Sequence, residues 1–129
     1  MSKLNFAQII VEASDAAKFA STNANPTPMV VGLATSIFSN DIVPGTEEVV
    51  NEGVCGFAWI KISGRGGFAK YVRENQLGGK GVYGGVQIWA SAFDGYNGQS
   101  LERKEASMRA ASEILTKHGI KNSVHSRMD

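Results

Sequence analysis

The spacing of apolar residues near the start of the chain predicts an amphipathic helix. From residue 6 to residue 20, apolar side chains recur every three or four positions, which is the period of one helical face. Asn5 and Gln8 have the spacing of a capping box, in which side chains satisfy free backbone N–H groups at a helix start. We expect this helix to end near Thr22, because Pro26 and Pro28 restrict the residues before them.

Four later segments have the patterns of strands. Residues 29–38 are short, uncharged and rich in β-branched side chains, which predicts a largely buried strand. Residues 54–62 and 82–93 alternate, with aromatic and polar side chains on one parity and small or aliphatic ones on the other. Residues 123–128 are compatible with a final strand. Residues 39–53, which contain a Pro-Gly turn signal, predict a loop or a partly ordered excursion.

Two further helices complete the expected fold. Residues 68–77 predict a short helix that Gly78 and Gly79 end. A longer helix is expected from the N-cap Ser100 to His118, closed by Gly119 in a Schellman motif. The order α-β-β-α-β-α-β predicts a single α+β domain over residues 1–129. We expect helices to pack on one face of a mainly antiparallel four-stranded sheet.

The composition is that of an ordinary globular protein. The chain has 129 residues, of which 43% are hydrophobic and 19% charged, and a net charge of +1 that disfavours indiscriminate duplex binding. No apolar run approaches the about 20 residues of a membrane-spanning helix. The first residues lack a secretory signal. We therefore expect no membrane partner and a cytoplasmic location. The lone cysteine, Cys55, has apolar neighbours and is expected to be buried and structural.

Charge is nevertheless unevenly distributed along the chain. Residues 41–52 contain four acids and no base, whereas residues 61–85 contain five basic residues against one acid. Such a division favours head-to-tail self-association or a local anion site.

The basic segment also holds eight of the fifteen glycines and is the leading candidate for a binding site. A strand, a glycine-rich turn and a helix start would present free N–H groups to phosphate or carboxylate, with cations nearby. The residues expected to form this anion site are Gly64, Arg65, Gly66, Gly67, Lys70, Arg73 and Lys80. The alternative is a plain connection whose glycines satisfy unusual backbone angles. Residues 79–84 match a dinucleotide-binding motif in letters only, because they follow a helix and enter a strand.

A second candidate site lies on the sheet face to which the aromatic side chains of the predicted strands point. Alternate positions along the strands place Trp59, Tyr83 and Trp89 on this face. In the last strand, Arg127 points to the same side as His125. Such a face can stack a nucleobase, at about 1–3 kcal/mol for each base. The tryptophans could instead belong to the core or to a homo-oligomer interface, where Trp, Tyr and Arg are enriched.

The histidines and acids form no catalytic pattern. His118 fits the favourable position of a cation at a helix end, and no two-histidine motif indicates a metal. We expect no catalytic residue, metal or cofactor. The sequence is interpreted as a non-enzymatic homo-oligomeric binding protein for an anionic, nucleotide-like small molecule. The alternatives are a single-stranded nucleic-acid module using the aromatic and basic face, or a structural protein that self-assembles through it.

Overall fold

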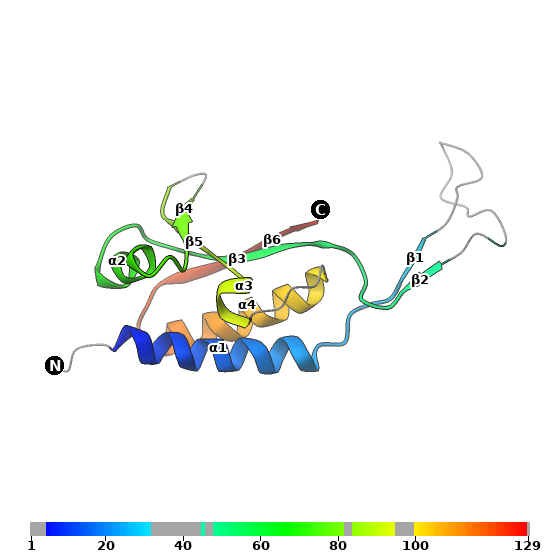
Figure 1. Ribbon diagram of the computed structural model, residues 1–129, viewed down its shortest axis with the longest axis horizontal. Helices are drawn as coiled ribbons and strands as arrows, with labels where there is room; N and C mark the ends of the chain where they lie inside the picture. Colours follow the sequence, from blue (N-terminus) through cyan, green and yellow to red (C-terminus); the bar gives the residue numbers. More distant parts are fainter. Residues whose placement is uncertain (1–4, 32–44, 46–47, 82–83, 95–99, 129) are drawn as a thin grey trace.

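The computed structural model describes residues 5–31, 45, 48–81, 84–94 and 100–128 and has an α+β fold, as predicted (Figure 1). Its elements follow the order α1 (Phe6–Asn23), β1 (Met29–Val31), β2 (Glu48–Val50), β3 (Gly56–Ile62), α2 (Gly67–Glu74), β4 (Gly79–Lys80), β5 (Val86–Trp89), α3 (Ser91–Asp94), α4 (Leu101–Lys117) and β6 (Asn122–Met128).

The main sheet is antiparallel and has four strands in the order β4-β5-β3-β6. The central strand β3 pairs with β5 on one side and with β6 on the other. The register places Ile60 between Ile88 and Val124. The expectation of a four-stranded antiparallel sheet is therefore confirmed.

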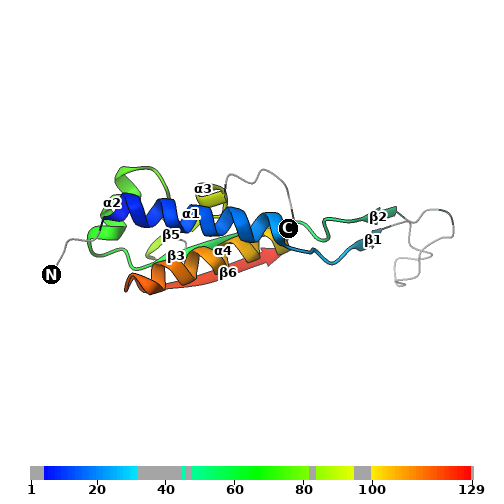
Figure 2. The ribbon, with the colours of Figure 1, turned by 90° about the horizontal axis from the view of Figure 1, so that it is seen from below.

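One face of this sheet is covered by α1 and α4, which run alongside each other (Figures 1 and 2). The side chains of β3 and β5 that point toward the helices are almost completely buried, as is Ala90 directly after β5: Ala58, Ile60, Ile62, Val86, Ile88 and Ala90. Small residues such as Ala13 and Ala17 on α1 face the core, which allows the helix to approach closely. Burial of this apolar set is the main stabilising contribution to the fold.

The predicted start of α1 and the predicted start and end of α4 are confirmed. The side chain of Asn5 accepts a hydrogen bond from the Gln8 N–H at 3.1 Å, and the side chain of Ser100 caps α4. At the other end of α4, Gly119 has a φ of 78° and the Ile120 N–H donates to the Leu115 carbonyl at 2.9 Å. This bond is the signature of the Schellman motif.

The strand expected at residues 29–38 does not belong to the four-stranded sheet. Its described part, β1, pairs with β2 in a separate two-stranded ribbon, and residues 32–38 lie outside the described part of the chain. Strand β2 lies within residues predicted to form a loop. The fourth strand of the main sheet is instead β4, whose two residues carry too little alternation to be recognised. Apolar periodicity predicts strands but not their partners.

The predicted strand at residues 82–93 is also too long. Of its described residues, 84–93, only Val86–Trp89 form a strand; the chain then turns into α3, which buries Phe93 in the core. The predicted end of α2 is corrected as well. Helix α2 ends at Glu74, before the two glycines, and Gln76 takes the left-handed backbone conformation with a φ of 56°.

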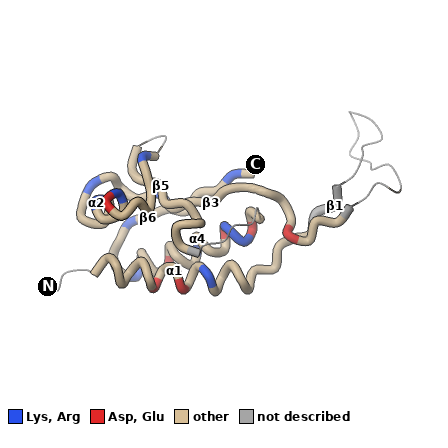
Figure 3. Tube along the Cα trace, in the orientation of Figure 1, with Lys and Arg blue, Asp and Glu red and all other residues tan. Residues whose placement is uncertain are grey.

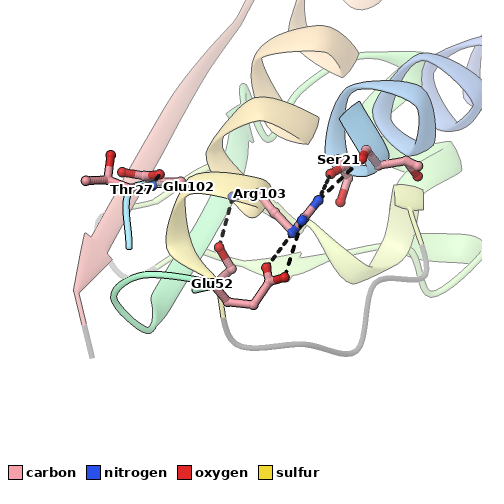
Figure 4. A network of polar contacts seen from close by, with 7 residues as sticks. Ser21, Thr27, Glu52, Glu102 and Arg103 are labelled. Carbon is pink, nitrogen blue, oxygen red and sulfur yellow. Dashed lines mark hydrogen bonds and ion pairs between the residues drawn. The ribbon is translucent and has the colours of Figure 1, made fainter. Parts of the chain in front are cut away.

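A polar network around Arg103 joins three segments that are distant in sequence (Figure 4). The guanidinium donates to the carboxylate of Glu52, after β2, and at 2.6 Å to the carbonyl of Ser21 at the end of α1. Beside it, the Thr27 N–H donates to the Glu102 carboxylate. The Arg103 hydrogen bond lowers the pKa of Glu52. These contacts anchor the chain where it leaves and re-enters the body around β1 and β2.

A second cluster joins α1 to the end of α4. The carboxylate of Glu12 lies 2.9 Å from Nζ of Lys117 and 2.9 Å from Nε2 of His118. The hydrogen bond from His118 is the largest cause of a lowered Glu12 pKa, followed by that from Lys117.

This lowered pKa predicts acid-dependent stability. The folded chain holds the Glu12 proton less tightly than the unfolded chain, so its contribution is complete above the ordinary pKa of 4.5 and lost as pH falls through the folded value. We expect Glu12→Gln to lower the melting temperature at a pH of about 7, and less so at about 3. Thermal unfolding at both pH values measures the difference.

Asp15→Asn is the matched control for Glu12→Gln. Asp15 is an exposed acid on the same helix, and within the described residues it has no ion pair. It should show little change at either pH. An equal effect of Glu12→Gln at both pH values would show that its carboxylate does not carry the acid dependence.

Candidate functional site

In the predicted anion loop, between β3 and α2, the Arg73 side chain binds the loop backbone. Gly66 precedes α2 with a φ of 97°, which explains the need for glycine there. The Nη1 atom of Arg73 donates to the Gly64 carbonyl at 3.0 Å, so this side chain braces the loop. Lys70 lies 3.9 Å from Glu74 on the exposed side of α2. Two of the predicted cations therefore already have partners within the protein: Arg73 on the loop and Lys70 on α2.

Two of the three aromatic residues predicted for the second site, Trp59 and Trp89, come together on the outer sheet face. Trp59 lies between Trp89 and His125 in the register of the three strands. Its ring centroid is 5.2 Å from that of Trp89, and His125 stacks on it at 5.9 Å. Because this face points away from α1 and α4, the interpretation of the tryptophans as core residues is wrong. Trp89 is 41% exposed.

The alternation of side chains along a strand explains which residues of β3 lie on this face. Successive outward positions of β3 are occupied by Phe57, Trp59 and Lys61. Lys61 stands between Gln87 and Ser123, one row beyond the row of rings. Moving along the strands, the face changes from aromatic to polar.

Two shallow hollows lie on this face and share Lys61, Gly84 and His125 as walls. The first, the aromatic hollow, has a volume of about 440 Å³ and is lined by Trp59, Trp89, Gln87 and Arg127 in addition to the shared residues. The second, the glycine hollow, has a volume of about 550 Å³ and contains Gly64, Gly85, Lys121 and Ser123. Together they are called the sheet groove.

The glycine hollow offers backbone and cations to an anion. Gly85 has a φ of 70°, and an added Cβ there would lie 2.6 Å from the Ile62 carbonyl, so only glycine fits. Lys61 and Lys121 contribute positive charge from β3 and from the start of β6. In Figure 3, basic positions also lie on β4, around α2 and near the end of β6.

The arrangement joins only part of the predicted site. Trp59, Trp89, Arg127 and Gly64 line the sheet groove. The remaining described candidates, Arg65, Gly66, Gly67, Lys70, Arg73 and Lys80, line neither hollow, and Tyr83 lies outside the described residues.

Several lining residues were absent from the predicted site. Lys61 and Gln87 share the parity of the tryptophans, so alternation alone could have added them. No local signal identifies Lys121 or Gly85, because each reaches the groove through the pairing of distant strands.

Cys55 corrects another prediction. The thiol is exposed, although its neighbours suggested a buried structural residue. Cys55 shares the odd parity of Phe57 and Trp59, and the even positions of β3 are the buried ones. The alternation along the strand therefore predicts the exposure of Cys55 correctly, whereas the apolar character of its neighbours does not.

Within the described ranges, no three His, Cys, Asp or Glu side chains gather in a way that could hold a metal ion. Nor is any helix there long and apolar enough to cross a membrane. Comparison of the chain with known proteins found no matching family model, no matching curated protein and no matching solved structure.

Proposed function

We propose that the chain is a non-enzymatic, homo-oligomeric binding protein that holds a nucleotide-like anion in the sheet groove. The observation that carries this proposal is the order of side chains along one open sheet face. The adjacent, mutually tilted rings of Trp59 and Trp89 adjoin a hollow that is lined by glycines and two lysines. A nucleotide has the same order: an aromatic base, a polar ribose and an anionic phosphate.

The dimensions of the groove agree with such a ligand. Trp59 and Lys61 are two residues apart on one strand, a separation of about 7 Å. A base stacked beside Trp89 would therefore place its ribose near Lys61 and Gln87. Phosphate oxygens would then meet Lys121 and the backbone near Gly85. Lysine side chains act as point charges toward phosphate.

The proposed ligand is expected to raise the melting temperature of the protein. A ligand at a hundred times its Kd stabilises the folded state by about 2.7 kcal/mol. Trp89→Ala should remove a stacking contact of about 1–3 kcal/mol and weaken binding about 5- to 150-fold. Lys61→Ala should weaken binding through its lost charge. Differential scanning fluorimetry with a panel of mono-, di- and triphosphate nucleotides measures both effects.

Arg65→Ala provides the matched control. It removes an exposed cation from the same glycine-rich segment, but Arg65 lines neither hollow. It should leave the nucleotide response unchanged. The proposal fails if no nucleotide raises the melting temperature, or if Arg65→Ala weakens the response as much as Lys61→Ala.

A single-stranded nucleic acid is the second candidate for the same face. Phe57 extends the aromatic set beyond the tryptophans, with its ring centroid 6.2 Å from that of Trp89. More than one base could therefore stack. Oligonucleotide anisotropy distinguishes the two, because binding of a strand should weaken steeply with salt as phosphate contacts are lost.

A further inference from the structure

The strands β1 and β2 form an arm that extends away from the body of the protein in both views (Figures 1 and 2). The arm is defined as residues Met29–Val31 and Glu48–Val50, which pair from Met29 with Val50 to Val31 with Glu48. Its base is held by the hydrogen bonds of Thr27 to Glu102 and of Arg103 to Glu52. The direction in which the arm leaves the body is therefore determined by fixed contacts.

The arm is apolar in sequence, and Val49 is an exposed apolar side chain on it. Five of its six residues are Met or Val, and Val49 is 58% exposed. An isolated two-stranded ribbon is at best marginally stable in water, and it normally needs a third strand or a packed face. A further strand against the arm would supply both hydrogen bonds and apolar contact.

The body offers a suitable edge at β6. This strand is the last in the order β4-β5-β3-β6, and among the described residues it pairs with β3 alone. It has seven residues and contains no proline. No strand of the described chain pairs with the other side of its backbone, so that side can accept a further strand. The opposite edge, β4, has only two residues.

The segment that contains the arm and the segment that contains the β6 edge have opposite charges. From Met29 to Val50 the sequence contains Asp41, Glu47 and Glu48 and no basic residue. From Ile120 to Met128 it contains Lys121, His125 and Arg127 and no acid; Asp129 follows, outside the described residues. Opposite charges on two surfaces favour their encounter, whereas two arms or two β6 edges would bring like charges together.

We propose that the arm of one copy pairs along the open edge of β6 in a second copy and extends its four-stranded sheet. This inference rests on the homo-oligomeric part of the proposed function and is independent of the nucleotide. Because arm and edge are different surfaces, the contact is head-to-tail. Each bound copy leaves an arm and an edge for the next, which leads to a ring or a filament.

Charge reversal with mixing tests this arrangement. The double variant Glu47→Lys/Glu48→Lys changes the charge of residues 29–50 from −3 to +1 and so has a basic arm with a basic edge. The double variant Lys121→Glu/Arg127→Glu changes the charge of residues 120–128 from +2 to −2 and so has an acidic arm with an acidic edge. Each variant alone is expected to associate about tenfold more weakly than the wild type. In an equimolar mixture every arm meets an edge of opposite charge, so association should return. Light scattering after size exclusion gives the masses, and circular dichroism verifies that each variant is folded.

Asp15→Lys, which reverses an exposed acid on α1, is the control and should associate like the wild type. Association of the variants alone that equals the wild type would overturn the arm-to-edge contact, and so would a mixture that stays dissociated. A monomeric wild type would overturn this inference together with the homo-oligomer. The nucleotide titration would still decide ligand binding separately.

Discussion

Alanine in place of Gly78 is expected to lower the free energy of unfolding by about 2–4 kcal/mol. A Cβ atom at this position would lie 2.2 Å from the carbonyl oxygen of Gln87 and 3.1 Å from Cγ1 of Val72. Neither neighbour can easily move, because Gln87 belongs to β5 and Val72 is fully buried. The turn between α2 and β4 must therefore separate from the sheet to admit the methyl group. Urea denaturation followed by circular dichroism measures the loss.

The adjacent glycine provides a control that differs only in its surroundings. A Cβ atom on Gly79 would meet no atom within 4 Å, and the residue is exposed on β4. Gly79→Ala should change the free energy of unfolding by no more than about 0.5 kcal/mol. Equal destabilisation by the two substitutions would contradict the close approach of this turn to β5.

The contrast between these glycines illustrates what local sequence can and cannot predict. Two glycines after a helical pattern are a usual termination signal, yet α2 ends earlier and Gln76 adopts the left-handed conformation. Gly78 is required because a strand formed later in the chain passes against it. That requirement arises from the tertiary structure and cannot be predicted from the residues next to Gly78 in the sequence.

Features that depend on neighbouring residues were predicted well. The alternation in β3 needs only the geometry of one strand, and it correctly separated buried Ile60 from outward Trp59. The caps at Asn5 and Ser100 are similar, since each satisfies a backbone N–H three residues away. Such interactions form within a single element and are encoded there.

The candidate site could be predicted only in part because separate strands assemble it. The concentration of charge around Arg65 and Arg73 drew attention to one loop, but Arg73 donates to the loop itself. The sheet groove instead combines Lys61 of β3 with Lys121 and with the glycines before β5. Its composition follows from the strand register, which the sequence pattern does not determine.

Shortening Ile60 to alanine is expected to destabilise the fold by about 2–5 kcal/mol. Ile60 is completely buried at the centre of β3, between Ile88 and Val124. The cavity cannot close easily, because β5 and β6 are both hydrogen-bonded to β3 and hold their spacing. The melting temperature should fall by roughly 4 °C for each kcal/mol lost. Calorimetry on the purified variant measures both quantities.

Lys61→Ala, one position further along the same strand, tests the opposite face. Its side chain points away from the core, so the free energy of unfolding should change by no more than about 0.5 kcal/mol. Ile60→Ala should melt earlier and still gain stability from the nucleotide, whereas Lys61→Ala should melt normally and lose part of that gain. Destabilisation by Lys61→Ala as large as that by Ile60→Ala would make Lys61 a structural residue. Since the two residues are consecutive in β3, opposite outcomes would assign different roles to the two faces of one strand: the inner face to stability and the outer face to the proposed ligand.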